Sequence, residues 1–295
     1  MEAPWTECPI GDAHVHFVTR TFLSALGGQC GKSAAEVAET AGWELPPQQA
    51  ADLAARWAAE LDRHGVARAA LIASVPGDEA SVRAAAIACP GRFYAYAMVN
   101  PLAPEGVDLS GLNGICLFPA MHGYGIGDAR VTPLVERAGA AGVVVFVHCG
   151  VLTVGIRRKL GLVSPFDMRW SNPIDLHPVA LRFPKTTFVI PHFGAGYFRE
   201  ALMTADLCPN VYLDTSSSNN WMRYEGLELK RVFRRALEVA GAKRLLFGTD
   251  SSFFPRGWQE AVFQAQVRVL RELDVSASDA RAILGGNLAR ICGES

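Results

Sequence analysis

The 295-residue sequence is most informative at first through what it lacks. Its seven cysteines include no CxxC pair, no apolar run is long enough to span a membrane, and neither sign of charge dominates, because 28 basic residues face 29 acidic ones. Scattered, unpaired cysteines are typical of free thiols in a reducing compartment. A net charge of -1 argues against nucleic acid or a membrane surface as a partner.

The opening stretch MEAPWTECPIG also lacks the basic start and apolar core of a signal peptide. We therefore expect a cytoplasmic protein that acts on a small molecule, with a homodimer left open. Half of the residues are hydrophobic, which is ample for a sizeable core. The length suits two domains or one α/β barrel of about 250 residues or more, and the absence of a break in composition favours a single domain over 1–295.

Short β-rich apolar runs alternate with Ala-rich amphipathic segments through most of the chain. We predict strands at 9–16, 67–74, 92–99, 114–118, 142–148, 186–192, 210–216 and 243–250. We predict helices at 46–65, 78–90, 131–142, 194–207 and 229–241. Eight strands that alternate with helices predict a (β/α)8 TIM barrel, with a doubly wound open sheet as the alternative.

Two connections are too long for ordinary turns. One follows the first strand at 18–45 and includes a candidate capping box formed by Ser33 and Glu36; the other follows the fifth strand at 150–173. Both lie on the side of the strand C-termini, where barrel enzymes build their active sites. Long loops in a compact domain are usually functional, so we expect them at the site.

Five side chains suited to metal chemistry fall at the same end of the predicted barrel. His14 and His16, in GDAHVHF, share one face of the first strand; His148, His192 and Asp250 end the fifth, sixth and eighth strands. Each alone could be a hydrogen-bonded core residue or a turn cap. Five in the same position favour a site for a divalent cation such as zinc.

These motifs resemble the amidohydrolase superfamily, and within it the amidohydrolase-related branch that includes aminocarboxymuconate-semialdehyde decarboxylase and pyrone dicarboxylate lactonase. The resemblance rests on DAHVH (12–16), VFVHCG (145–150), IPHFGAG (190–196), LFGTDSS (246–252) and ILGGNLARI (283–291). It implies one divalent metal, zinc or manganese, held by His14, His16, His148 and Asp250. It also implies that His192 is an acid/base group or a further ligand.

Some members of the superfamily hold two metals bridged by a carboxylated lysine on the fourth strand. Here that strand reads GICLF, and none of the five lysines ends a strand, so we expect a single ion. Cys116 could be a thiolate ligand, but small-residue core packing is the favoured interpretation. Asp12 and Asp214 either hydrogen-bond the ligand imidazoles or merely end their strands.

The resemblance implies a hydrolase that uses a metal-activated water on an ester, lactone or amide of a small polar, carboxylate-bearing metabolite. His192 or Asp250 would transfer the proton. The alternative is a metal-dependent non-oxidative decarboxylase, and the remote one is an inert barrel that acts as a binding protein. For the substrate we expect Arg169 and Trp170 in the second long loop, with Arg157 and Arg158 as alternatives. His122, after the fourth strand, either contacts the substrate or packs its loop.

Overall fold

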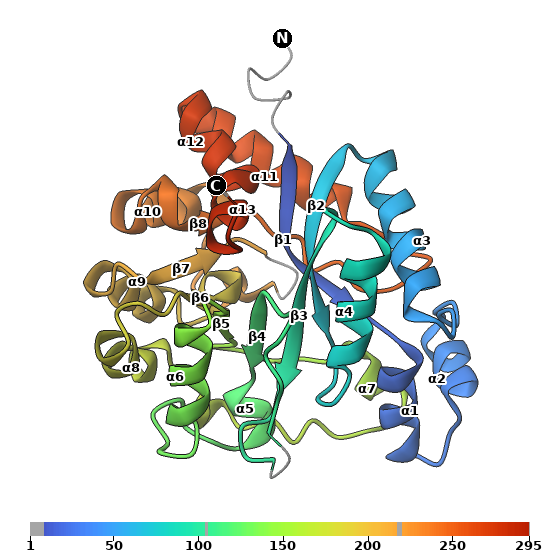
Figure 1. The fold of residues 1–295 in the computed structure, drawn as a ribbon. Coiled ribbons are helices and arrows are strands. Elements are labelled where there is room, and N and C mark those ends of the chain that lie inside the picture. The colour runs from blue at the N-terminus through green and yellow to red at the C-terminus, as the bar shows by residue number, and fades with distance from the viewer. Residues whose placement is uncertain (1–8, 104–105, 217–219, 295) are drawn as a thin grey trace.

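The computed structural model describes residues 9–103, 106–216 and 220–294. Eight parallel strands follow one another in chain order through a single sheet (Figure 1). They are β1 (Ile10–Phe17), β2 (Val66–Ala73), β3 (Phe93–Val99), β4 (Gly114–Leu117), β5 (Val144–Val147), β6 (Phe188–Ile190), β7 (Val211–Asp214) and β8 (Leu245–Leu246). All eight predicted strands are confirmed in order and approximate position.

The first and last strands meet, so the sheet curls into a nearly closed barrel rather than an open sheet. The backbone N–H of Ala13 donates to the carbonyl oxygen of Phe247 at 2.8 Å, that of His16 to Ser251 at 2.7 Å, and that of Asp250 to His14 at 2.9 Å. The chain is therefore a (β/α)8 barrel, and the doubly wound alternative is wrong. This seam also brings Asp250 beside the two histidines of β1.

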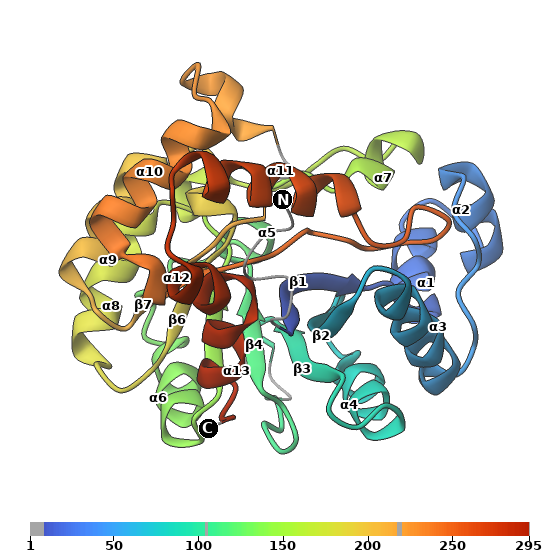
Figure 2. The same cartoon turned by 90° about the horizontal axis from the view of Figure 1, so that it is seen from above.

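Helices surround the strands (Figure 2). Those between successive strands include α3 (Ala50–Arg63), α4 (Glu79–Ala88), α6 (Thr132–Ala140), α8 (His177–Arg182), α9 (Phe198–Leu207) and α10 (Leu229–Ala240); α5 (Pro119–His122) is a single turn after β4, and α11 (Glu260–Glu272), α12 (Ala277–Arg281) and α13 (Asn287–Ile291) follow β8. The five predicted helices correspond to α3, α4, α6, α9 and α10. The long α11 was not predicted.

Alternating strand residues divide the core into two layers, because successive side chains of a strand point to opposite faces. One layer, including Val15, Ala97 and Val145, lies between the strands and the helices. The other fills the barrel interior and includes Tyr96, Phe146 and Cys116. Burial of Cys116 inside the barrel agrees with the packing role favoured for it.

The two long connections form a small cap beside the barrel, which we define as residues 18–45 and 152–162. It contains α1 (Arg20–Gly28), α2 (Ala34–Ala41) and α7 (Gly155–Lys159), which lie together in both views (Figures 1 and 2). Ser33 and Glu36 make both hydrogen bonds of the predicted capping box at the start of α2. Within the described residues, none of the helices combines the length and apolar character that crossing a bilayer requires.

Candidate metal centre and its cavity

Three of the predicted ligands meet at the carboxyl end of β1. His14 and His16 approach with their Nε2 atoms 3.4 Å apart. Oδ1 of Asp250 lies 3.6 Å from His14 Nε2 and 3.4 Å from His16 Nε2. One nitrogen or oxygen ligand atom from each of the three residues, which we call the triad, lies within 4.8 Å of the others. Two imidazole nitrogens and a carboxylate oxygen form a donor set suited to zinc.

Hydrogen bonds turn the two imidazoles of the triad toward the shared space. The carboxylate of Asp214, at the end of β7, accepts from His14 Nδ1 at 2.5 Å. The hydroxyl of Ser74 donates to the carbonyl oxygen of Ile72, so it can accept from His16 Nδ1, 3.1 Å away. In the neutral form of each ring, both contacts favour a proton on Nδ1 and leave the Nε2 lone pair for a cation, as the partners of metal-binding histidines do.

The two aspartates that the sequence left open therefore have different roles. Asp214 contacts a ligand imidazole. Asp12 instead accepts hydrogen bonds from the backbone N–H groups of His14 and Thr249, the Thr249 hydroxyl and the Trp258 indole. Asp12 thus fastens the seam between β1 and the segment after β8 rather than a ligand ring.

His148 and His192 lie beside the triad and are buried. The His192 ring is 4.8 Å from the His14 ring and 5.4 Å from the His148 ring, centroid to centroid. His148 does not belong to the compact ligand group found among the described residues, and its buried Nδ1 makes no hydrogen bond within them. The structure thus gathers all five predicted residues, with His14, His16 and Asp250 closest together.

A strained turn aims His192 at the site. Five successive residues, 192–196, have positive φ, and three of them (His192, Phe193 and Ala195) are not glycine. Left-handed conformations are uncommon for such residues and each costs about 1–3 kcal/mol. Nδ1 of His192 lies 3.1 Å from the carbonyl oxygen and 2.8 Å from the hydroxyl of Ser216. Such strain at a site of this chemistry supports a functional role for the ring.

The electrostatic environment keeps most of these imidazoles neutral. Burial lowers the pKa of His16 to about 4, despite the attraction of Asp250. Burial and the neighbouring histidines also lower the pKa of His148 and of His192. A cation binds only the neutral form of the ring, so these shifts favour ligation.

His14 differs because carboxylates surround it. Burial lowers its pKa, but the attraction of Asp214, followed by that of Asp250 and Asp12, outweighs this and raises the pKa to about 9. Burial acts against the charged form of Asp214, yet the contact with His14 lowers the pKa of that carboxyl. Without a cation the pair is therefore a buried imidazolium with its own negative counter-charge. A cation that binds His14 must displace the Nε2 proton, while Asp214 keeps the proton on Nδ1.

A cavity of about 450 Å³ opens over these residues. His16, His148, His192 and Asp250 line it together with Ser74, Arg256 and apolar side chains such as Phe118, Met121, Leu152, Trp43 and Phe253. Part of the second long loop also lines it, namely residues 152–156 together with Arg158 and Lys159. This size and mixed lining suit a small metabolite.

The three residues expected to contact substrate lie elsewhere. Arg169 is 83% exposed and pairs with Asp167 at 2.6 Å. Trp170 packs beside Gly125, and His122 lies against Tyr124 with the rings 6.5 Å apart. None of the three lines the cavity. Arg169 lies outside this cavity because the carboxylate of Asp167, two residues earlier, holds its guanidinium locally.

Sequence reasoning missed several residues that the fold brings to the site. Ser74 follows β2, Ser216 follows β7 and Arg256 follows β8. Ser74 and Ser216 share a signal that was present in the sequence, since each is the last residue of a predicted strand, 67–74 and 210–216. Arg256 had no such signal, because its position depends on the path of a loop.

A model of the amidohydrolase family matches residues 12–293, nearly the whole chain. The chain belongs to the amidohydrolase family. Among curated proteins it is 36% identical over 85 residues to Protein fluG of Emericella nidulans, and the match covers 29% of this chain and 10% of that protein. The chain thus spans about a tenth of the length of that relative.

Solved structures share the fold of this amidohydrolase. The 5-carboxyvanillate decarboxylase of Sphingomonas paucimobilis has a TM-score of 0.66 at 17% identity, covering 98% of this chain and 100% of its own. A probable 2-pyrone-4,6-dicarboxylic acid hydrolase of Acinetobacter baumannii has a TM-score of 0.62 at 13% identity, covering 97% and 99%. Because one of these is named a decarboxylase and the other a probable hydrolase, the shared fold alone does not select the reaction.

Proposed function

We propose that this amidohydrolase is a metal-dependent hydrolase of an ester, lactone or amide in a small carboxylate-bearing metabolite. The observation that carries the proposal is the convergence of His14, His16 and Asp250, of which His16 and Asp250 line a cavity together with His192. A single zinc or manganese ion would be held by this triad, with His148 as the fourth ligand. Such an ion supplies Lewis-acid polarisation of the substrate and activation of a water.

Two residues near the proposed ion could transfer the proton during hydrolysis. The carbonyl oxygen of Ser216 can only accept, so its contact with His192 favours a proton on Nδ1. In a neutral ring, Nε2 is then unprotonated and can take a proton from the attacking water, then return it to the leaving group. Asp250 is the second candidate for this transfer, because its carboxylate also lines the cavity.

A second candidate function, decarboxylation of an aromatic acid, is favoured by the walls of the cavity. Phe118, Met121 and Phe253 could hold a ring, and the same cation site could bind a carboxylate. Both reactions require an open cation site and one proton-transfer group, and the triad and His192 are the residues that would supply them.

Product analysis separates the two reactions. Metal-reconstituted protein is assayed against lactones, amides and aromatic carboxylic acids in ¹⁸O-labelled water. Incorporation of ¹⁸O into the product supports the hydrolase, and CO2 release from an acid identifies a decarboxylase. Absence of both with zinc and with manganese would contradict an enzymatic role and favour a binding protein.

A further inference from the structure

The cavity over the triad is more positive than the chain as a whole. Three cationic side chains line it, those of Arg158, Lys159 and Arg256, whereas Asp250 is the sole carboxylate among the described residues that line it. The whole chain, by contrast, has a net charge of -1. Because clefts focus the field of their charged groups, this local excess favours an anionic ligand.

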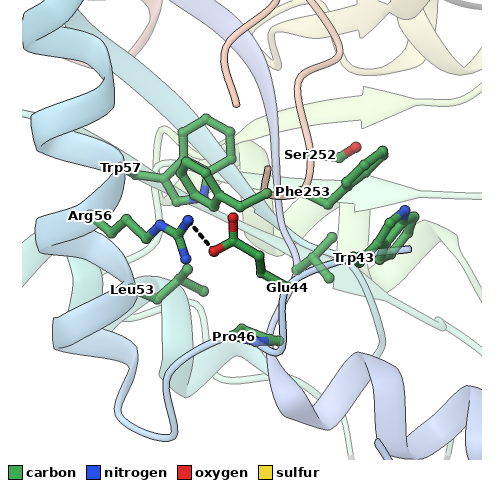
Figure 3. Close-up of a pocket in the computed structure, with 10 residues that line it drawn as sticks. Trp43, Glu44, Pro46, Leu53, Arg56, Trp57, Ser252 and Phe253 are labelled. Atoms are coloured by element: carbon green, nitrogen blue, oxygen red, sulfur yellow. Dashed lines mark hydrogen bonds and ion pairs between the residues drawn. The ribbon is translucent and has the colours of Figure 1, made fainter. Parts of the chain in front are cut away.

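Arg256 is fixed at the wall of the cavity by three contacts. Its Nη2 donates to Ser252 Oγ at 2.7 Å and to the carbonyl oxygen of Asp250 at 3.2 Å. Its guanidinium carbon lies 4.5 Å from the centre of the Phe253 ring. That ring in turn stacks on Trp43, with centroids 4.1 Å apart (Figure 3). The loop after β8 and the cap therefore orient the side chain together.

These contacts use only part of the guanidinium. Within the described chain, Nε and Nη1 of Arg256 make no hydrogen bond, and no carboxylate forms an ion pair with this side chain at 4.0 Å or less. A planar group with preset orientation and unused donors is suited to bind a carboxylate, since little conformational freedom is lost on binding.

On α7, the side chain of Arg158 also has unused hydrogen-bond donors, unlike the side chains of its two neighbours. Arg157 donates to Gln29 Oε1 at 2.9 Å and Lys159 donates to the carbonyl oxygen of Ala41 at 2.6 Å, so both hold α7 against the first part of the cap. The Arg158 side chain makes no hydrogen bond or ion pair among the described residues, and Arg158 lines the cavity. Its neighbours anchor the helix, and Arg158 remains available to a ligand.

We propose that Arg256 binds a carboxylate of the substrate, with Arg158 as a second contact, and that the substrate is a planar acid whose other polar end reaches the triad. This inference rests on the proposed function, because it takes the cavity over the triad as the active site. It assigns to Arg256 the role that the sequence suggested for Arg169. Apolar side chains such as Phe118 and Met121 would contact the plane of the molecule.

Calorimetric binding of isophthalate and of its neutral diamide, isophthalamide, tests the assignment in zinc-loaded and in chelator-treated protein. We expect the wild type to prefer the dianion in both forms. Arg256→Gln should weaken isophthalate binding by about tenfold or more, the scale of one charge-assisted contact. Arg169→Gln is the matched control and should bind as the wild type does, since Arg169 pairs with Asp167 outside the cavity.

Arg256→Lys tests whether weaker isophthalate binding by Arg256→Gln comes from misfolding rather than from the missing guanidinium. It retains the charge without the planar fork, so we expect an affinity between those of the wild type and Arg256→Gln. Equal affinity of the wild type for both probes, no binding of isophthalate in either form, or undiminished binding by Arg256→Gln would overturn the inference. Failure of the proposed function would appear differently, as absence of bound metal or of metal-dependent turnover in the wild type.

Discussion

Replacing Asp214 with asparagine should weaken metal binding through the tautomer of His14. The carboxylate accepts two N–H groups at once, the backbone N–H of Ser216 on Oδ1 at 2.6 Å and His14 Nδ1 on Oδ2 at 2.5 Å. Asparagine has one acceptor oxygen and so keeps only one of these contacts. If it retains the Ser216 contact, its NH2 group faces His14 Nδ1, which must then accept, and the ring proton moves to the Nε2 that points at the triad.

The expected loss is 10–100-fold in zinc affinity, about 1.4–2.7 kcal/mol, the usual effect of removing the partner of a ligand imidazole. Competition with a chromophoric chelator measures this affinity, and thermal unfolding of the metal-free proteins measures the separate effect on stability. Asp12→Asn is the matched control, because Asp12 is equally buried but binds the His14 backbone rather than its ring. We expect that variant to lose stability and to bind zinc more tightly than Asp214→Asn does.

Unchanged zinc affinity in Asp214→Asn would refute this reasoning. Equal losses in the two variants would refute it as well, because the effect would then follow from any lost buried carboxylate rather than from the ring that Asp214 contacts.

Three further results are expected. His148→Ala should lose metal and activity together. His192→Ala should retain its metal, measured by elemental analysis, while its turnover falls by about 10²–10⁴-fold. A metal-free His192→Ala would instead show that His192 is a ligand. Zinc at about 100 times its Kd should stabilise the chelator-treated protein by about 2.7 kcal/mol, and an unchanged melting temperature would contradict a site specific to the folded state. Gly150→Ala should lower the free energy of unfolding by about 1–3 kcal/mol, because Gly150 has φ +78° and an added Cβ would lie 2.2 Å from the carbonyl oxygen of Gly194. Gly155 has open space around it, so Gly155→Ala is the control and should have the free energy of unfolding of the wild type.

The barrel and the floor of its site could be predicted because both depend on strand periodicity. Strand ends in a parallel barrel meet at one edge, so His14, His148 and His192 had to converge once their strands were recognised. The i, i+2 spacing of His14 and His16 then fixed their common face. Asp250 was harder, since β8 is only two residues long and Asp250 lies four residues beyond it. The seam hydrogen bonds place it.

The walls of the cavity could not be predicted in the same way, because loops have no period. A short sequence pattern does, however, indicate which loop arginines already pair with a nearby aspartate. In Asp167-Met-Arg169 and in Asp128-Ala-Arg130 the aspartate accepts from both the backbone and the guanidinium of the arginine two residues later. An arginine in this D-x-R pattern is already occupied by its neighbour. Arg256 follows no such aspartate, and its availability could be read only from the closed loop.

The seam between β1 and β8 links the floor of the site to its wall. Asp12 binds both the backbone of His14 and the indole of Trp258, and the Asp250 carbonyl accepts from Arg256 and from Gln259 Nε2. The segment that contributes the Asp250 carboxylate to the triad thus also contains Arg256, whose guanidinium we propose to bind the substrate. Because one rigid turn positions both groups, the separation between the cation site and the bound carboxylate is set by the fold. The length of the acid should therefore decide which substrates react.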